Sequence, residues 1–167
     1  MAKPANIPSL EEIRQLPADL TMAVPPQWED RNGHVNVQHY LSLYDLAGWK
    51  ILENIGIDES YLEGGNGGIF DLENHIRYLA EIRVGEVVSV HNRMLGRDHK
   101  RFHGMLFIVN DTGQRLASTI EYLSIHVDRQ QRRAAPFPDD MAAKLDDLLT
   151  LHNALSWSVP LCRGFGI

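Results

Sequence analysis

The sequence predicts a single α+β domain over residues 1–167, in which a curled antiparallel sheet of about five strands surrounds one long helix, with a further helix near each terminus. Three observations support this fold class. A wide apolar stripe with helical spacing runs from residue 37 to residue 55, a series of strand-like segments follows it, and short turns separate those segments. Because short turns join only antiparallel neighbours, we expect the strands to form a meander.

The N-terminal segment carries a helix start followed by a short strand. Ser9 and Glu12 have the spacing of a capping box, which predicts a short helix over residues 9–16. Residues 21–24 have strand character, and the two prolines that follow place this strand at an edge or mark its end.

The strongest periodic signal lies between residues 37 and 55. Apolar side chains recur there every three or four positions, at Tyr40, Leu41, Tyr44, Ala47, Ile51, Leu52 and Ile55. This spacing predicts one largely buried helix, about 27 Å long, that begins after an Asn36 N-cap and ends near residues 54–56. Gly48 lowers its helix propensity by about 1 kcal/mol, which is either incidental or explained by a close approach to the sheet.

The strands follow a glycine-rich segment, residues 63–68, which we expect to be a flexible loop. The predicted strands cover residues 69–84, 87–95, 101–109 and 115–127. Val88, Val90 and Met94 alternate along the second of these and are expected on one face. Residues 110–113, Asn-Asp-Thr-Gly, predict a hairpin turn.

The C-terminal segment predicts one more helix and an apolar tail. Pro138 opens the helix, which has an acidic first turn and apolar residues on one face, namely Met141, Leu145, Leu148 and Leu149. The apolar residues of the tail are Trp157, Val159, Leu161 and Phe165. They are expected to cover either their own sheet or a neighbouring subunit.

Composition excludes several classes of function. The net charge is −6, from 16 basic and 22 acidic residues, so a nucleic-acid partner is not expected. No apolar run approaches the roughly 20 residues of a membrane span, and the N-terminus lacks the apolar region of a signal peptide. The single cysteine, Cys162, cannot form an internal disulfide. These features predict a soluble cytoplasmic protein without a membrane partner.

The most informative segment is Asp30-Arg-Asn-Gly-His-Val-Asn-Val-Gln-His-Tyr40, which ends a strand-like region and opens the long helix. It places a carboxylate, an imidazole and carboxamides beside the free N–H groups of a helix N-terminus. Such a site can hold the carbonyl oxygen of an ester or thioester. Each of these residues also has an ordinary structural interpretation, because Asp and Asn form turns and cap helices.

This segment carries a resemblance to known enzymes. Asp30-x-x-Gly33-His34-Val35-Asn36, followed by Tyr40 and a long helix, resembles the signature of the 4-hydroxybenzoyl-CoA thioesterase-like family of hotdog-fold proteins. The motif Asp30-x-Asn32-x-His34-Val35-Asn36 also resembles the acyl-ACP thioesterases of plants. Residues 76–86 look like the strand pair that follows the central helix in these enzymes. The order of elements matches over roughly residues 20–128.

The resemblance implies a hotdog fold and an acyl-CoA thioesterase that hydrolyses a small or medium acyl-CoA to the free acid and CoA. It also implies a homodimer or homotetramer with sites at subunit interfaces, and neither a metal nor a redox cofactor. By this analogy the backbone N–H of Val37 is the oxyanion donor. Asp30 is the reacting carboxylate, which either attacks the carbonyl carbon or deprotonates a water.

The remaining candidates have open alternatives. His34 shuttles a proton, orients the carboxylate or is structural, and Asn32 positions water or forms the turn. Tyr40, Tyr44 and Glu73 are candidates for the acyl site. The alternatives are that the two tyrosines belong to the core, as aromatic residues at helical spacing often do, and that Glu73 is a solvated surface charge. Arg97, Lys100 and Arg101 are candidates for the CoA phosphates, or form a charged turn. Asp30, His34 and His39 lack the spacing of a metal site.

Two other functions fit the same features. A hotdog hydratase or dehydratase uses an acid and a histidine to move water on a double bond. A non-catalytic acyl-CoA-binding module on the same scaffold is the second alternative, because a fold does not fix a function.

The aromatic residues Tyr40, Tyr44 and Trp49 suit an aryl group or, through cation–π contacts, a quaternary ammonium. Some members of the resembling family act on betainyl-CoA.

Overall fold

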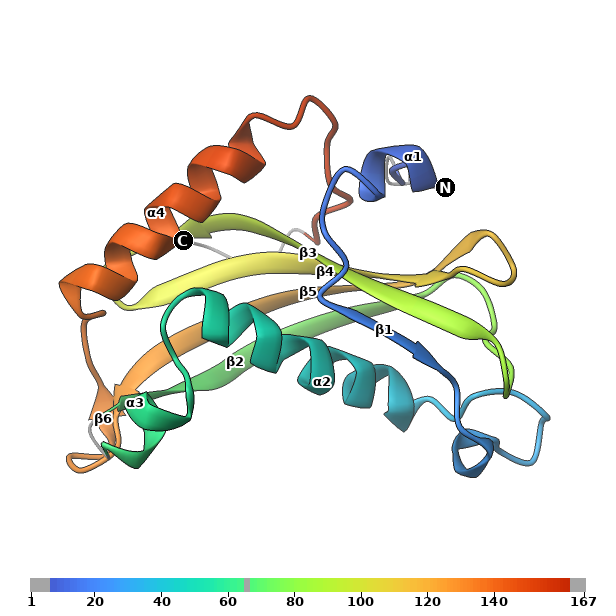
Figure 1. Ribbon diagram of the computed structural model, residues 1–167, viewed down its shortest axis with the longest axis horizontal. Coiled ribbons are helices and arrows are strands. Elements are labelled where there is room, and N and C mark those ends of the chain that lie inside the picture. Colours follow the sequence, from blue (N-terminus) through green and yellow to red (C-terminus); the bar gives the residue numbers. More distant parts are fainter. Residues whose placement is uncertain (1–6, 65–66, 163–167) are drawn as a thin grey trace.

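The computed structural model describes residues 7–64 and 67–162, and in these ranges one antiparallel sheet curls around a long central helix (Figure 1). Its strands are β1 (Leu20–Ala23), β2 (Gly67–Tyr78), β3 (Val87–Arg97), β4 (Arg101–Asn110), β5 (Arg115–Asp128) and the short β6 (Arg133–Ala134). The main order is β1-β3-β4-β5-β2, and β6 pairs with β5. The predicted α+β class, with a curled antiparallel sheet around one helix, is confirmed.

The central helix α2 (Gln38–Asn54) lies against the concave face of the sheet (Figure 1). Its buried residues are Tyr40, Leu43, Ala47 and Ile51. They pack against strand residues that are fully buried, including Val90, Leu106 and Ile120. Burial of apolar surface stabilises a fold by about 25 cal/mol per Å², so this contact contributes to the stability of the domain. Val88, Val90 and Met94 share one face of β3 in this core, as the alternation predicts.

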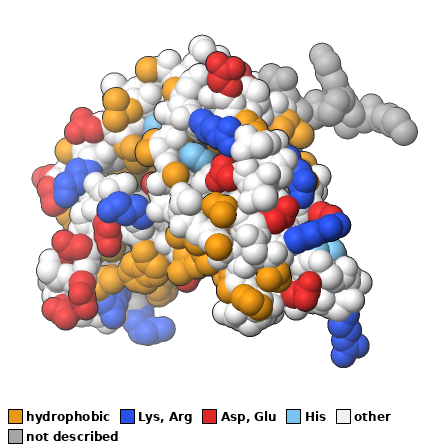
Figure 2. Space-filling view, turned by 45° about the vertical axis from the view of Figure 1, so that its right-hand side comes forward, with side chains coloured by type: hydrophobic (Ala, Val, Ile, Leu, Met, Phe, Trp, Pro, Cys, Tyr) orange, Lys and Arg blue, Asp and Glu red, His pale blue; other side chains and the backbone are white. Residues whose placement is uncertain are grey.

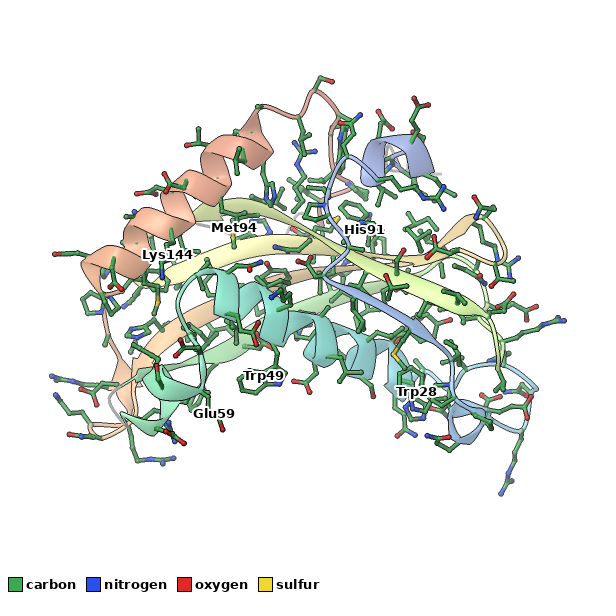
Figure 3. The ribbon with its side chains drawn as sticks, in the orientation of Figure 1. Trp28, Trp49, Glu59, His91, Met94 and Lys144 are labelled. Carbon is green, nitrogen blue, oxygen red and sulfur yellow. The ribbon has the colours of Figure 1, made fainter. Side chains whose placement is uncertain are left out.

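The ends of α2 follow from local chemistry. The Gln38 N–H donates to Oδ1 of Asn36 at 3.1 Å, so the predicted capping carboxamide is used although the helix boundary falls one residue later, at Val37. The helix stops at Gly56, whose φ of +95° is the left-handed conformation that terminates helices. Trp28 lies beside the N-terminal end of α2 (Figure 3) and stacks on His39 with ring centroids 4.7 Å apart.

The convex face of the sheet is covered by chain from both ends of the protein. The helix α1 (Leu10–Ile13) begins at the predicted capping box, in which Glu12 N–H donates to Ser9 Oγ at 3.2 Å. The helix α4 (Asp139–Asn153) packs against β3. Trp157 of the tail packs with Phe107 and Ile13 in a second core. The tail therefore covers its own sheet, while Phe165 lies outside the described residues.

Two details differ from the sequence prediction, and the alternative left open for Gly48 is decided. The strand expected over residues 69–84 begins at Gly67 and ends at Tyr78, so two glycines assigned to a loop are strand residues. A β-carbon on Gly67 would lie 2.0 Å from Tyr61 Oη, which explains glycine there. Tyr61 belongs to a short unpredicted helix, α3 (Glu59–Glu63). Gly48 makes no close approach, because a β-carbon there would meet nothing within 4 Å.

The remaining elements are connectors. A single 3₁₀ turn, η1 (Pro26–Trp28), joins β1 to the segment before α2. The hairpin between β4 and β5 turns at the predicted residues, where Gly113 N–H donates to Asn110 Oδ1 at 2.8 Å. None of the described helices is both long and apolar enough to cross a membrane.

Candidate active site

The segment between η1 and α2 folds into a tight turn that holds Asp30. Asp30 N–H donates to His34 O at 2.9 Å, and Gly33 N–H donates to Asp30 O at 3.1 Å. Gly33 has φ +78°, which a residue with a side chain adopts only with strain. Val35 N–H donates to Ile82 O at 2.8 Å, so the turn is fixed to the segment after β2. The glycine of the sequence motif therefore serves the turn.

The Asp30 carboxylate is held in its ionised form. Its Oδ1 accepts the Asn32 backbone N–H at 2.7 Å, and its Oδ2 accepts the Asn32 side-chain amide at 3.3 Å. His34 Nδ1 lies 3.7 Å from Oδ1. The hydrogen bond from the Asn32 backbone, followed by the other neighbours, lowers the pKa of Asp30 below its usual value. The predicted trio Asp30, Asn32 and His34 is thus brought together.

This carboxylate faces an open cleft beside the start of α2. The cleft has a volume of about 400 Å³, and its lining includes Asp30, His34, Val37, Tyr40 and Tyr78. Tyr40 and Tyr78 meet edge to face, with ring centroids 5.0 Å apart. Asp30 retains 16% exposure of its side chain, so it is accessible to a ligand in the cleft.

Val37, which lines this cleft, carries a backbone donor. Within the described part of the chain, the Val37 N–H donates no hydrogen bond, and Asn36 Oδ1 accepts the N–H of the next residue, Gln38. Val37 is 56% exposed. An unpaired amide at the positive end of a helix can bind a carbonyl oxygen. A carboxylate and an amide donor at one cleft are the two groups that acyl transfer needs.

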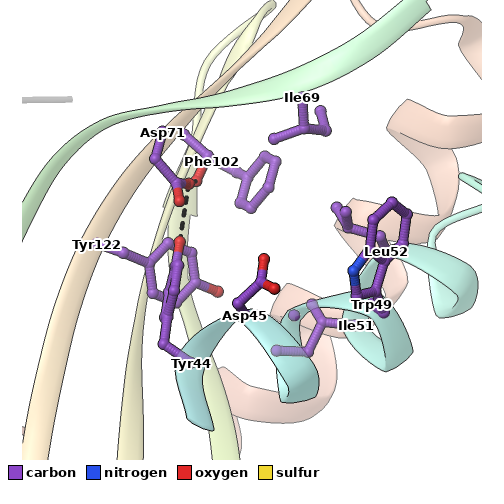
Figure 4. Close-up of a pocket in the computed structure, with 11 residues that line it drawn as sticks. Tyr44, Asp45, Trp49, Ile51, Leu52, Ile69, Asp71, Phe102 and Tyr122 are labelled. Atoms are coloured by element: carbon purple, nitrogen blue, oxygen red, sulfur yellow. Dashed lines mark hydrogen bonds between the residues drawn. The ribbon is translucent and has the colours of Figure 1, made fainter. Parts of the chain in front are cut away.

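Tyr44, predicted to share the acyl site with Tyr40, lies in a different cavity (Figure 4). This second cavity, of about 180 Å³, lies between α2 and the concave face of the sheet. Tyr44 Oη donates to Asp71 Oδ1 at 2.7 Å. Asp71 was not predicted as a site residue, although an acidic residue inside the apolar run Ile69-Phe-Asp-Leu72 is an unusual feature of the sequence.

The other predicted binding residues are not near Asp30 within one chain. Arg97 forms a bidentate pair with Asp146 of α4, at 2.7 and 2.5 Å, and Arg101 pairs with Asp98 at 2.7 Å. The β3–β4 turn that carries them and Lys100 lies at the α4 end of the sheet, opposite the start of α2 (Figure 1). Glu73 is exposed on β2. Their roles in binding CoA or the acyl group stay predictions.

One group of described side chains has a spacing that a metal ion could use. The donor atoms of His75, Glu121 and Cys162 lie within 4.8 Å of one another. Glu121 is buried, and both of its oxygens are already engaged, by His103 Nε2 at 2.9 Å and by the Cys162 N–H at 2.5 Å. The carboxylate is therefore satisfied without a metal, and the group lies apart from the Asp30 cleft.

The sequence comparisons point to one family. Residues 24–145 match a family model described as the thioesterase-like superfamily. A betainyl-CoA thioesterase of Pseudomonas aeruginosa is 33% identical over 144 residues, which cover 86% of this chain and 87% of that protein. An L-carnitine dehydrogenase/betainyl-CoA thioesterase of Agrobacterium fabrum is 36% identical over 121 residues, which cover 72% of this chain but only 25% of that longer protein.

Solved structures share the fold. A Staphylococcus aureus protein solved in complex with CoA superimposes with a TM-score of 0.80 at 24% identity, covering 89% of this chain and 93% of that one. A 1,4-dihydroxy-2-naphthoyl-CoA thioesterase from Synechocystis gives a TM-score of 0.69 at 17% identity, covering 77% and 95% of the two chains. Both have the same curled sheet and central helix.

Proposed function

On the premise that this chain belongs to the thioesterase-like superfamily of hotdog-fold proteins and is a thioester hydrolase, we propose that it hydrolyses betainyl-CoA to betaine and CoA. The predicted family and the predicted enzyme class, an acyl-CoA thioesterase, are confirmed. The acyl group and the residues that carry out the reaction are the content of the proposal.

One observation carries the choice of acyl group. The likeness to the Pseudomonas aeruginosa protein, a betainyl-CoA thioesterase, spans 87% of that protein. The match to the longer Agrobacterium fabrum protein, which combines this activity with L-carnitine dehydrogenase, supports the same substrate. These relatives favour a thioesterase over a hydratase or a non-catalytic CoA-binding module.

We propose that the Val37 N–H holds the carbonyl oxygen of the thioester. As the carbonyl carbon becomes tetrahedral, negative charge develops on this oxygen, and an amide fixed at a helix N-terminus stabilises it without reorganising. Loss of such a donor typically costs about 2.7–4 kcal/mol in the transition state. The free donor and the exposure of Val37 support this role.

Asp30 supplies the other half of the reaction. It either attacks the carbonyl carbon, expelling the CoA thiolate and leaving a mixed anhydride that water hydrolyses, or it takes a proton from the attacking water. Its lowered pKa keeps the carboxylate ionised at neutral pH, which both routes require. His34 and Asn32 position the carboxylate through the contacts described above.

We also propose that the active protein is a homodimer, or a tetramer built from such dimers. β2 is a long strand at the edge of the sheet, and an open edge is a template for pairing with another chain. Apolar side chains lie exposed on α2 and β2, including Leu41, Trp49, Phe70 and Leu72. Figure 2 shows apolar patches on the underside of the molecule, the side on which α2 lies in Figure 1.

The function is tested by release of CoA thiol from betainyl-CoA and from acetyl-CoA, with Asp30→Asn as the matched control. We expect a higher kcat/KM for betainyl-CoA and a loss of turnover in the variant. Absence of a preference for betainyl-CoA would refute the substrate, and full activity of Asp30→Asn would refute the role of Asp30. Light scattering tests the assembly, since a particle of one 18.9 kDa chain would refute the dimer.

A further inference from the structure

The second cavity, described above for Tyr44, has a lining unlike that of the Asp30 cleft. Four aromatic side chains from α2, β4 and β5 contribute to it, namely Tyr44, Trp49, Phe102 and Tyr122 (Figure 4). The Tyr122 ring lies 5.7 Å from that of Tyr44 and 6.0 Å from that of Phe102, measured between centroids. Trp49 projects near the middle of α2 (Figure 3) and is 48% exposed. Several ring faces around one small space are the arrangement that binds organic cations.

Two carboxylates lie in the same lining, from Asp45 and Asp71. Among the residues that the structure describes, neither forms an ion pair with a basic side chain. The rest of the lining is apolar or aromatic, apart from three hydroxyls, the indole N–H of Trp49 and the helix backbone. Negative charge that has no cationic partner in the protein, next to aromatic faces, is complementary to a positively charged ligand.

The hydrogen bonds of the cavity leave carboxylate oxygens free for a cation. Tyr44 Oη and Ser124 Oγ both donate to Asp71 Oδ1, at 2.7 and 2.6 Å. Among the described residues, no donor reaches the second oxygen of Asp71 or either oxygen of Asp45, which lines the same cavity. The cavity therefore suits a cationic ligand, and its aromatic faces provide the apolar contact that a quaternary ammonium needs.

Gly48 leaves room for this ligand. It lies in the interior of α2 and lines the cavity, and a β-carbon there would meet no atom within 4 Å. Glycine in a helix interior costs about 0.5–1 kcal/mol relative to alanine. The helix thus carries its least favourable residue where a side chain would narrow the cavity.

We propose that this cavity binds the quaternary ammonium group of an acyl chain whose thioester lies in the Asp30 cleft of a second copy of the protein. The inference rests on the proposed function and extends it by naming the residues that select the acyl group. Trp49 and Asp71 are specificity residues in this proposal, and Asp30 remains the reacting group.

A second copy is needed because, within one chain, the cavity lies too far from Val37 for a betainyl group to span the distance. Val37 and the α2 residues of the cavity, Tyr44 to Leu52, are separated by 7–15 positions, which is about 10–22 Å along the helix axis at 1.5 Å per residue. In a betainyl group the nitrogen is two bonds of about 1.5 Å each from the carbonyl carbon. One chain therefore cannot place the carbonyl at Val37 and the ammonium in its own cavity.

A two-fold dimer solves this difficulty. A two-fold axis that pairs the β2 edges places the two copies of α2 antiparallel. The N-terminal end of one helix, with Asp30 and Val37, then lies toward the C-terminal half of the other, with Trp49 and its cavity. Trp49 lines the cavity and is exposed, so the cavity opens at the surface of α2, the helix that this dimer would place beside its copy.

The first experiment separates charge from shape. Betainyl-CoA is compared with 3,3-dimethylbutyryl-CoA, in which carbon replaces the charged nitrogen and the size is retained. We expect the wild-type kcat/KM to favour the charged substrate by about tenfold, in the range of cation–π contacts that exclude water. Trp49→Leu and Asp71→Asn are expected to bring this ratio close to one. Leu46→Ala, an exposed α2 residue outside both cavities, is the control and keeps the wild-type ratio.

The outcomes distinguish this inference from the proposed function. If wild-type protein hydrolyses neither compound, the proposed function is wrong. If it hydrolyses both with equal kcat/KM, or if the ratio survives in Trp49→Leu and Asp71→Asn, the ammonium site is wrong. Gly48→Leu tests the site even if Trp49→Leu or Asp71→Asn unfolds. Leucine favours the helix, so the fold is retained, and its side chain fills the cavity. It is expected to raise the KM for betainyl-CoA while the melting temperature is maintained, and an unaltered KM overturns the site.

The second experiment tests the sharing between copies. Asp30→Asn and Gly48→Leu chains carrying different affinity tags are co-expressed, and the mixed dimer is purified through both tags. If the site is shared, one of its two sites contains an intact Asp30 and an intact cavity, so about half of the wild-type activity is expected. A mixed dimer no more active than the mean of the two parent dimers would show that each chain uses its own cavity, which overturns the shared site.

Discussion

The guanidinium group of Arg93 lies over the indole ring of Trp157, with Cζ 4.1 Å from the ring centroid. Arg93 Nη1 also donates to the Trp157 carbonyl at 2.6 Å, and Nη2 donates to the carbonyls of His152 and Leu155 at 3.2 Å each. The arginine is only 7% exposed. One β3 side chain therefore joins the end of α4 and the tail to the convex face of the sheet.

Replacement of Arg93 should detach the tail. In Arg93→Lys a single ammonium cannot reach three carbonyls in the fork geometry of arginine, and buried acceptors lose their donors. We expect the free energy of unfolding to fall by about 2–4 kcal/mol, measured by urea denaturation, and proteolysis after residue 153 to accelerate. The exposed pair Arg83–Glu81 supplies the control, since Arg83→Lys should cost less than about 0.5 kcal/mol. Equal losses in the two variants would contradict this role.

Protonation of Asp30 should cause no fall in activity toward low pH as long as the pH stays above about 4. Hydrogen bonding lowers its pKa below the usual value of 3.8, so the carboxylate stays ionised as the pH falls from 7 toward that value. Asp30→Asn is expected to reduce kcat by at least about a hundredfold, in line with the loss of a reacting group. Steady-state kcat/KM for betainyl-CoA between pH 4.5 and 8 is the measurement. A limb in this range that disappears when Asp30 is replaced would contradict the assignment.

His152 should make the protein less stable in acid. Burial, with a contribution from the charge of Arg93, lowers the pKa of His152 to about 4, and its Nδ1 accepts the Met94 N–H at 2.8 Å. As the pH falls from about 6.5 to 4, the unfolded chain binds a proton at this residue that the folded protein does not. The stability that the neutral imidazole provides is present above pH 6.5 and is lost over that window, by an amount on the order of 2–3 kcal/mol.

The measurement is the free energy of unfolding of wild type and His152→Asn at pH 4 and 7. Asparagine keeps an acceptor near the Nδ1 position but does not titrate, so the difference between the two proteins should shrink or reverse at pH 4. Only this difference is informative, because Asp19 acts in the opposite direction. Burial raises the pKa of Asp19 to about 6, so its contribution weakens as the pH rises. Parallel pH curves for the two proteins would contradict the prediction for His152.

Gly104 of β4 should not tolerate a methyl group. A β-carbon there would lie 2.3 Å from Tyr122 Oη, whose hydroxyl donates to Asn92 Oδ1 at 2.8 Å. Tyr122 is buried, so Gly104→Ala should displace it and cost about 2–4 kcal/mol, seen as a lower melting temperature. Gly96→Ala on β3 is the matched control, because its β-carbon would meet nothing within 4 Å. A similar effect of both substitutions would exclude steric displacement of Tyr122.

Local patterns were sufficient for most of the fold. The stripe from residue 37 to 55 predicted α2, whose observed end at Asn54 lies within the expected range. Alternation and the turn at residues 110–113 predicted β3, β4 and β5. The strand after the glycines was predicted too late and too long, because Gly67 and Gly68 lack strand propensity but are required by the packing of Tyr61 and Arg129.

The same distinction between local and long-range contacts applies to the candidate site residues. Asp30, Asn32 and His34 are near one another in sequence, so a short turn brings them together. Arg97 was a candidate for the CoA phosphates or for a charged turn, and its pairing with Asp146, which lies 49 residues away in the chain, was not predicted. Asp71 and Tyr122 were not identified, because their contact with Tyr44 depends on the pairing of β2 with β5.

The helix, the strand series and the acidic turn at the helix start could be predicted before folding was considered, because each depends on residues that are neighbours along the chain. The folded structure was needed to show that Tyr40 and Tyr44 line different cavities, and that two carboxylates and four aromatic side chains line the cavity beneath α2. Side-chain periodicity indicates only which face of an element is buried. What that face meets is set by strand register and by the angle at which the helix crosses the sheet.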